Sequence, residues 1–173
     1  MPKAFTRVLQ KRYENPHFDV TSGQSIDRTI YESTVFDRAR FADCRWDDCR
    51  FFHVHVNPHS KFERCIFSRC RFERRTTNLA AHFLECRFED CTFASLRFAQ
   101  ARFTRCHFSA RFTSVVFFGP EAPEGWETIV EECDFTASQF IDSDFRLGID
   151  TSTCVFPKDY DPHWVYPIQK NVA

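Results

Sequence analysis

Residues 83–93 read FLECRFEDCTF, and this stretch decides the fold. Phenylalanine returns at every fifth position, as Phe83, Phe88 and Phe93, and a cysteine stands two residues before each of the last two. A period of five fits neither the roughly 3.6 residues per turn of an α-helix nor the alternation of an ordinary strand. The stretch therefore predicts a repeat of five residues, in which one large and one small apolar side chain face the core.

The same period runs through most of the chain. Eighteen of the 22 phenylalanines obey it, with a one-residue slip after Phe108. They are Phe36, Phe41, Phe51, Phe62, Phe67, Phe72, Phe83, Phe88, Phe93, Phe98, Phe103, Phe108, Phe112, Phe117, Phe135, Phe140, Phe145 and Phe156. The same place is taken elsewhere by Ile26, Tyr31, Trp46, Val56 and Val130. A period held over such a length predicts a repeat architecture, in which successive coils stack and bury a continuous core.

All nine cysteines follow this period, because each lies two residues before a large apolar residue. They are Cys44, Cys49, Cys65, Cys70, Cys86, Cys91, Cys106, Cys133 and Cys154. Elsewhere that position holds mostly Ala, Ser or Thr. We therefore predict that the cysteines are reduced and buried, and that they serve as small core residues. A C-x4-C spacing is not that of a zinc knuckle, and thiols stacked one coil apart are too distant for a disulfide.

This repeat resembles that of the pentapeptide-repeat proteins, which is usually written A-(D/N)-L-x-x. The resemblance covers residues 24–156, with phenylalanine in place of leucine, cysteine in place of much of the alanine, and arginine where aspartate or asparagine is usual. It implies an all-β fold, a right-handed quadrilateral β-helix with four repeats in each coil. The cysteine spacing agrees with such coils, because Cys44, Cys65, Cys86 and Cys106 follow one another at intervals of 21, 21 and 20 residues.

Each open end of such a solenoid needs a cover. Phe5, Val8, Leu9 and Tyr13 have helical spacing, so we predict a short N-terminal cap helix over residues 4–14. At the other end we expect four residues of the tail to fold back over the last coil, namely Tyr160, Trp164, Tyr166 and Ile168. The chain then divides into an N-terminal cap at residues 1–20, the β-helix at 21–156 with an inserted loop at 118–127, and a C-terminal cap at 157–173.

The sequence contains no signature of catalysis, cofactor binding or membrane insertion. It has only four glycines, lacks a phosphate-cradling loop and matches neither G-x-S-x-G nor H-E-x-x-H. No apolar run is long enough to cross a bilayer, and the N-terminus does not read as a secretory signal. We therefore expect a cytoplasmic, non-enzymatic protein without cofactor or metal. His53, His55 and His59 form the alternative metal site, although solvated histidines at a coil corner are the simpler explanation.

The charges divide the chain into a basic and an acidic part. Residues 1–120 hold 20 of the 23 lysines and arginines and 13 of the 24 aspartates and glutamates, whereas residues 121–173 hold three and 11. The net charge of −1 therefore conceals an electrostatic dipole along the chain. We expect the acidic end to attract a basic partner.

The segment FFGPEAPEGWETI, residues 117–129, is the longest break in the repeat. Functional residues concentrate on such loops, and a tryptophan beside carboxylates is a suitable interface anchor. We therefore predict that the chain binds another protein through this loop and the acidic coils after it. The predicted binding residues are Phe118, Glu121, Glu124, Trp126, Glu127, Glu131 and Glu132. The alternative is that the loop is a flexible corner of the solenoid and that Trp126 packs against the coil.

Two other functions stay open. Some pentapeptide-repeat proteins resemble duplex DNA and protect type II topoisomerases from poisons, so the resemblance implies gyrase binding as one alternative. This sequence departs from those proteins in its lack of overall acidity and of an apolar C-terminal helix. Nucleic-acid binding is the other alternative, carried by Arg97, Arg102, Arg105 and Arg111 in a stretch without acidic residues. It is less favoured, because the aromatic residues that would stack on bases are used in the core. The sequence names neither the partner nor the oligomeric state.

Overall fold

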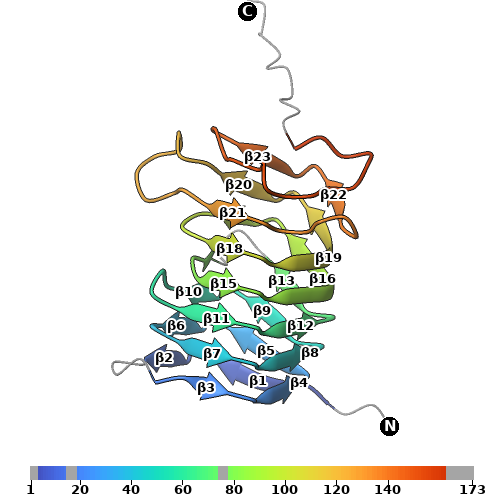
Figure 1. Cartoon of the computed structure of the whole chain (residues 1–173). Coiled ribbons are helices and arrows are strands. Elements are labelled where there is room, and N and C mark those ends of the chain that lie inside the picture. Colours follow the sequence, from blue (N-terminus) through green and yellow to red (C-terminus); the bar gives the residue numbers. More distant parts are fainter. Residues whose placement is uncertain (1–3, 15–18, 74–77, 163–173) are drawn as a thin grey trace, which may run out of the picture.

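The computed structural model describes residues 4–14, 19–73 and 78–162, and it is a four-sided solenoid of short strands (Figure 1). The paired strands are all parallel, each with a strand of the coil above or below it. Regular structure in the described residues consists of strands alone, so the predicted all-β class is confirmed. In this part of the chain there is no helix long and apolar enough to cross a membrane.

In the regular coils, one short strand segment lies on each of four faces. The first face contains β4 (Ser25–Asp27), β8 (Arg45–Asp47), β12 (Ile66–Ser68) and the opening parts of β16 (Arg87–Ala94) and β19 (His107–Thr113). The second contains β1 (Thr6–Leu9), β5 (Thr29–Glu32), β9 (Arg50–Phe52), β13 (Arg71–Glu73), the closing parts of β16 and β19, and β22 (Gln139–Ile141). The third contains β2 (Arg12–Glu14), β6 (Val35–Asp37), β10 (His55–Val56), β14 (Asn78–Leu79), β17 (Arg97–Phe98), β20 (Val116–Phe118) and β23 (Asp144–Arg146). The fourth contains β3 (Thr21–Ser22), β7 (Arg40–Ala42), β11 (Lys61–Glu63), β15 (His82–Leu84), β18 (Arg102–Thr104) and β21 (Ile129–Glu131).

The parallel register places the repeated aromatic rings in columns inside the coils. On the first face Phe88 stacks on Phe67 and on Phe108, with ring centroids 5.0 and 4.8 Å apart and nearly parallel planes. Rings of neighbouring columns meet edge to face, as Phe88 does with Phe83 at 5.7 Å. Both arrangements are favourable for aromatic pairs, and these rings are buried. The core that the period predicts is therefore confirmed.

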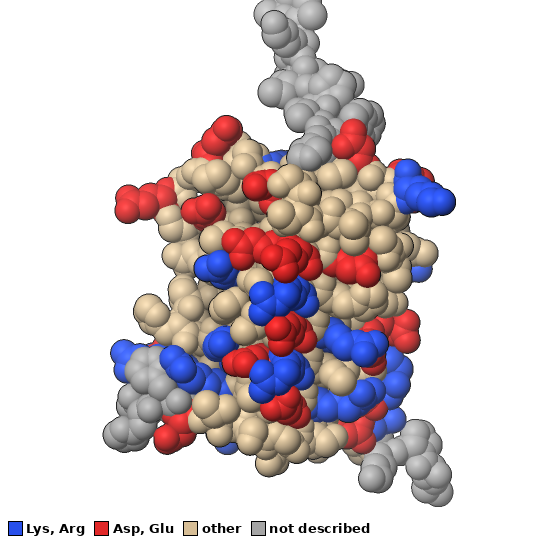
Figure 2. Space-filling model, viewed as in Figure 1, with Lys and Arg blue, Asp and Glu red and all other residues tan. Residues whose placement is uncertain are grey.

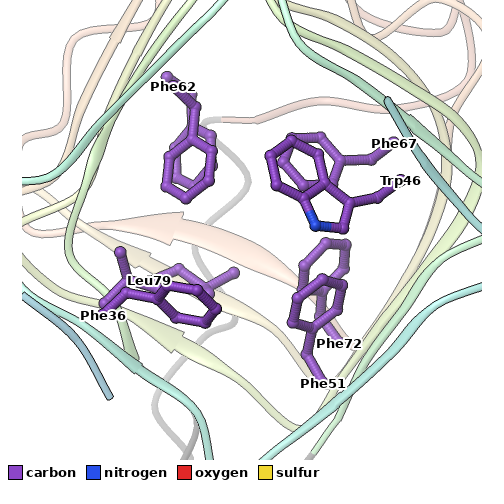
Figure 3. A pocket seen from close by; sticks show the side chains of 9 residues that line it. Phe36, Trp46, Phe51, Phe62, Phe67, Phe72 and Leu79 are labelled. Atoms are coloured by element: carbon purple, nitrogen blue, oxygen red, sulfur yellow. The ribbon is translucent and has the colours of Figure 1, made fainter. Parts of the chain in front are cut away.

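The aromatic column of the third face is interrupted midway along the solenoid. Val56 and Leu79 follow Phe36 in this column, where the other faces carry aromatic rings. Their smaller side chains leave a hollow of about 10 Å³, which lies between the four columns of side chains in Figure 3. Its lining is apolar, so we expect it to hold no water.

Where the small residue of a repeat is Cys, Ser or Thr, its side chain satisfies a buried carbonyl group. Cys86 donates a hydrogen bond to the carbonyl oxygen of Phe62 in the preceding coil, at 3.3 Å. The hydroxyl of Ser138 takes the same role toward the carbonyl oxygen of Phe108, at 2.8 Å. A buried carbonyl needs such a partner, and Cys, Ser and Thr supply one within a small volume. These residues therefore suit the position both because they are small and because they can donate a hydrogen bond.

All nine cysteines are free, and they are buried except for Cys154, which is partly exposed. Burial raises the pKa of Cys86 and of Cys106 well above that of a free thiol. Contact with Cys106, together with burial, raises the pKa of Cys133 to about 12. Since the thiolate is the reactive form, Cys86, Cys106 and Cys133 are inert at neutral pH. The prediction that the cysteines are core residues is confirmed for the eight that are buried.

The predicted N-terminal cap helix over residues 4–14 is wrong. The segment forms β1 and β2 instead, which pair with β5 and β6 as part of the first coil. Val8 and Tyr13 belong to the helical pattern, but they are also five residues apart and pair with Tyr31 and Phe36. Tyr13 stacks on Phe36 with ring centroids 4.9 Å apart. The five-residue period prevails because it extends two columns that the next coil already contains.

At the C-terminal end Tyr160 covers the last coil, as the sequence predicts. Its ring stacks on Phe140 with centroids 4.1 Å apart, and its hydroxyl donates to the carbonyl oxygen of Ser143 at 3.0 Å. This contact extends the aromatic column of the second face by one ring. Trp164, Tyr166 and Ile168 lie outside the described residues.

Removal of a single aromatic ring from this core should destabilise the fold strongly. Phe88→Ala should lower the free energy of unfolding by about 3–5 kcal/mol, because it leaves a cavity between packed layers. The matched control is Arg87→Ala, which removes the neighbouring outward side chain and its exposed pair with Glu89. That pair contributes at most about 1 kcal/mol. Chemical denaturation followed by circular dichroism measures both variants, and equal losses would contradict the inward assignment of Phe88.

Candidate partner-binding surface

The loop that follows β20 (Figure 1) carries the predicted anchor, which is Trp126. The Trp126 ring meets the ring of Phe118 edge on, with centroids 5.5 Å apart and an interplanar angle of 72°. Trp126 nevertheless keeps 40% of its surface exposed. The contact with Phe118 therefore orients the indole ring and leaves it open to a partner.

The loop is docked on the coil that follows it. The backbone N–H groups of Gly119 and Glu121 donate to the carbonyl oxygens of Arg146 and Leu147, at 2.8 and 3.0 Å. A Cβ atom added at Gly119 would lie 2.1 Å from the backbone nitrogen of Ile149, so only glycine allows this approach. These contacts hold the first residues of the loop on the next coil.

The predicted carboxylates have different surroundings. Those exposed on the loop belong to Glu121, Glu124 and Glu127. Glu131 is half-buried on β21 and accepts a hydrogen bond from the guanidinium of Arg102 at 2.9 Å. Glu132 is exposed at a corner, where its backbone N–H donates to the hydroxyl of Thr153 at 3.0 Å. Four of the five carboxylates are therefore exposed to a partner, and Glu131 is engaged within the fold.

The four arginines of the nucleic-acid alternative do not come together on one surface. Arg97 lies on β17 in the third face, Arg102 on β18 in the fourth, and Arg111 on β19 in the second. Arg105 stands at the corner between the fourth and first faces, and it donates to Glu85 at 2.8 Å. Successive repeats of one coil point to different sides. A stretch of sequence without acidic residues therefore wraps round the coil and forms no stripe.

Charges of alternating sign run along that corner instead. The residues just before one column of cysteines are Asp43, Arg64, Glu85, Arg105 and Glu132. Figure 2 shows a vertical row of blue and red side chains that alternate along this side of the molecule. Arg64 donates to Asp43 at 2.8 Å, and this hydrogen bond lowers the pKa of the Asp43 carboxyl. Each of the five has a φ between 50° and 54°, the left-handed conformation that turns the chain from one face to the next. Arginines in this row are already paired with acids.

The histidines do not form a metal site. His53 occupies a corner with a φ of 50°, whereas His55 lies on β10, so the two do not share one straight strand. His59 belongs to the turn after β10. The described residues contain no group of three His, Cys, Asp or Glu side chains that could hold a metal ion.

A hollow of about 330 Å³ lies beside the loop, and sequence reasoning did not identify it. β21 lines one side, Glu127 contributes from the loop, and residues 148–150 and Thr153 line the rest. Figure 2 shows acidic side chains gathered round this end of the molecule. The sequence feature that could have indicated this hollow is a second break in the repeat near Gly148. This break falls at the same corner of the solenoid as the loop.

No protein-family model and no curated protein matches the chain in sequence. Among solved structures, a trypsin-treated form of QnrB1, a pentapeptide-repeat protein described as a plasmid-mediated fluoroquinolone resistance protein, has a similar fold. The TM-score is 0.50 at 17% sequence identity, over 88% of this chain and 78% of that chain. The chain has the pentapeptide-repeat fold. The resemblance seen in the sequence is thereby confirmed at the level of the fold.

A second pentapeptide-repeat structure is HetL from a Nostoc cyanobacterium, which is described as involved in heterocyst differentiation regulation. It matches at 10% identity and a TM-score of 0.29, over 83% of this chain and 57% of that chain. Within the pentapeptide-repeat solenoid described here, the loop at 118–127 and the hollow beside it are departures from the regular coil. They are therefore the candidate functional surface.

The docked loop predicts a strong effect at one glycine. Gly119→Ala should lower the free energy of unfolding by about 3 kcal/mol, because the new methyl group meets the backbone of Ile149. The control is Gly23→Ala, where φ is +64° but nothing lies within 4 Å of the added atom. Its cost is backbone strain alone, about 1 kcal/mol. Thermal denaturation compares the two, and equal losses would show that the loop is not docked.

Proposed function

We propose that this pentapeptide-repeat solenoid is a non-enzymatic protein that binds another protein through the loop at 118–127 and the acidic coil beside it. The observation that carries the proposal is the exposed ring of Trp126, held in one orientation by Phe118. A ring that is already oriented loses little side-chain entropy on binding. Tryptophan in such a position is a common source of binding energy in protein interfaces.

The charge of this surface indicates the chemistry of the partner. Glu121, Glu124 and Glu127 are exposed around Trp126, and basic residues are scarce in this part of the chain. Carboxylates arranged in this way speed the approach of a basic surface and disfavour an acidic one. The proposal therefore places a basic protein surface against the loop, in a reducing compartment such as the cytoplasm where free thiols persist.

A second candidate is a type II topoisomerase as the target, with protection of that enzyme from a poison. It is favoured by the likeness in fold to QnrB1, a fluoroquinolone resistance protein, and by the acidic end of the solenoid. At 17% identity this likeness concerns the fold alone. Nucleic-acid binding has less support, because Arg102 and Arg105 are paired with Glu131 and Glu85.

The anchor role of Trp126 predicts a loss of binding without a loss of folding. Trp126→Ala should weaken capture of the partner from a lysate of the source cells by more than about tenfold, the effect expected of an interface hot spot. Ile141→Ala is the matched control, because Ile141 is also an exposed apolar residue but lies on β22 in the second face. Quantitative pull-down with equal melting temperatures measures the effect. Equal capture by the wild-type chain and Trp126→Ala would sink the proposal.

The topoisomerase candidate has its own measurement. The purified chain should restore supercoiling by DNA gyrase that a fluoroquinolone has inhibited, at low micromolar concentrations. Trp126→Ala should restore less activity, because the same loop would contact the enzyme. Failure with several poisons, and with both bacterial type II enzymes, would remove this candidate and leave protein binding of another kind.

A further inference from the structure

The first coil forms an open end of the solenoid. The strands β1, β2, β3 and β4 each pair with one strand of the second coil, and they have no other strand partner among the described residues. Figure 1 shows these four strands at the end of the solenoid opposite to the loop at 118–127. The predicted cap helix would have covered this end, but residues 4–14 are themselves strands of the coil. The solenoid therefore ends in four strand edges, one on each face.

The backbone of β1 shows that its edge is accessible. The N–H groups of Thr6 and Gln10 donate to carbonyl oxygens of the second coil, at 2.9 and 3.0 Å. Alternate residues of a strand direct their backbone groups to opposite sides, so Arg7 and Leu9 direct theirs to the outer edge. Both residues are exposed, and Leu9 keeps 54% of its surface accessible. The described chain therefore does not bury this edge, which is free to pair with another strand.

The inward side chains of the first coil lack a layer over them. Val8, Tyr13 and Ile26 occupy the columns of three faces and are only partly buried, whereas their partners in the second coil are at most 7% exposed. On the fourth face the first coil carries Thr21, and its partner Phe41 in the second coil is also only partly buried. Burial of such apolar surface is favourable. The end is thus an apolar centre surrounded by strand edges.

The shape of this end selects the kind of partner. A partner that covers all four edges must present four strand edges in the same arrangement, and the first coil of a second copy does so. The end of a coil is a helical ramp, and a ramp coincides with itself after half a turn about an axis perpendicular to the solenoid. Two copies related by such an axis would therefore follow each other's step, as an isologous interface requires. Their facing strands would run antiparallel, which allows regular hydrogen bonds.

The charges also favour contact between two first coils. Residues 4–27 carry three basic and three acidic residues, namely Arg7, Lys11, Arg12, Glu14, Asp19 and Asp27. Acids of one copy can therefore meet bases of the other, and the two ends have no net repulsion. The other end of the solenoid is strongly acidic, and Tyr160 stacks over its last coil. Two such ends would repel each other, and Tyr160 would obstruct a first coil that approached them.

We propose that two copies of this chain associate through their first coils, as a two-fold dimer in which β1–β4 of one copy face β1–β4 of the other. The inference goes beyond the proposed function and does not depend on it. Since the loop at 118–127 lies at the opposite end, the dimer carries one candidate partner surface at each far end (Figure 1). A partner with two binding sites would then be held by both copies.

Sedimentation of the full chain tests the association. It should show a species of twice the chain mass of 20.5 kDa, in a proportion that rises with concentration. Glu14→Lys combined with Asp27→Lys should weaken this dimer by at least about tenfold, because it places like charges on the facing ends. The matched control combines Glu124→Lys with Asp159→Lys, the same change of charge on exposed residues of the other end. It should change the association by less than about twofold, the screened effect of distant surface charges.

A charge exchange distinguishes contact between two first coils from contact between opposite ends. Arg7→Glu combined with Lys11→Glu makes the first coil acidic, so this variant should also be monomeric by itself. Mixed with the Glu14→Lys and Asp27→Lys variant, it should form a heterodimer, because the facing ends then carry opposite charges. Fluorescein on one of the two variants identifies the heterodimer by its sedimentation. If the first coil instead met the acidic end of another copy, the Glu14→Lys and Asp27→Lys variant would associate more strongly by itself.

Several outcomes would overturn the inference. They are a chain that stays monomeric at about 100 µM, where even a weak dimer would be populated, equal weakening by the two lysine variants, and a mixture of the two charged variants without heterodimer. Melting temperature and circular dichroism establish that each variant is folded. Trp126→Ala should leave the dimer unchanged, so loss of partner capture and loss of association are observed separately.

Discussion

Stacking of each inward ring on the equivalent ring of the next coil is the interaction on which the rest of this structure depends. A parallel ladder in register sets identical positions one above another, and Phe88 therefore meets Phe67 on one side and Phe108 on the other. Such pairs add a preferred geometry to the burial of a large apolar side chain. A shift of one residue within a strand would turn its ring outward, so the one-residue slip after Phe108 is absorbed at a corner, where the register of β16 with β19 shifts between Glu89 and Cys91.

This constraint determines where the chain can vary. The interval between Cys106 and Cys133 is 27 residues, yet Phe103 still pairs with Val130 across it. The additional residues leave the coil at the corner between the third and fourth faces and return to the same register. Loop length affects stability only weakly, whereas a shift of the ladder would expose the core. The candidate surface therefore lies at a corner, where the stacked core does not restrict the sequence.

Two departures from the regular coil meet at that corner and together shape the surface. The loop at 118–127 is bound to the next coil through Gly119, and the chain after Gly148 passes β21 without forming a strand beside it. Between these two departures lies the hollow of about 330 Å³, and Glu127, Glu131 and Asp150 bring carboxylates to its lining.

The sequence by itself determined the five-residue repeat, the two positions of each repeat that face the core, and the burial of the cysteines. It could do so because neither a helix nor an ordinary strand has a period of five. It also identified Trp126 and its carboxylates, since they interrupt that period. It did not determine the secondary structure of residues 4–14, because Val8 and Tyr13 fit both the helical spacing and the five-residue repeat. Only the pairing of these two residues with Tyr31 and Phe36 shows that the segment forms strands. The scattering of the four arginines and the hollow beside the loop depended on the tertiary structure. These features depend on which coils and faces are neighbours in space. Residues far apart in the chain, such as Gly119 and Ile149, come into contact only in the folded solenoid.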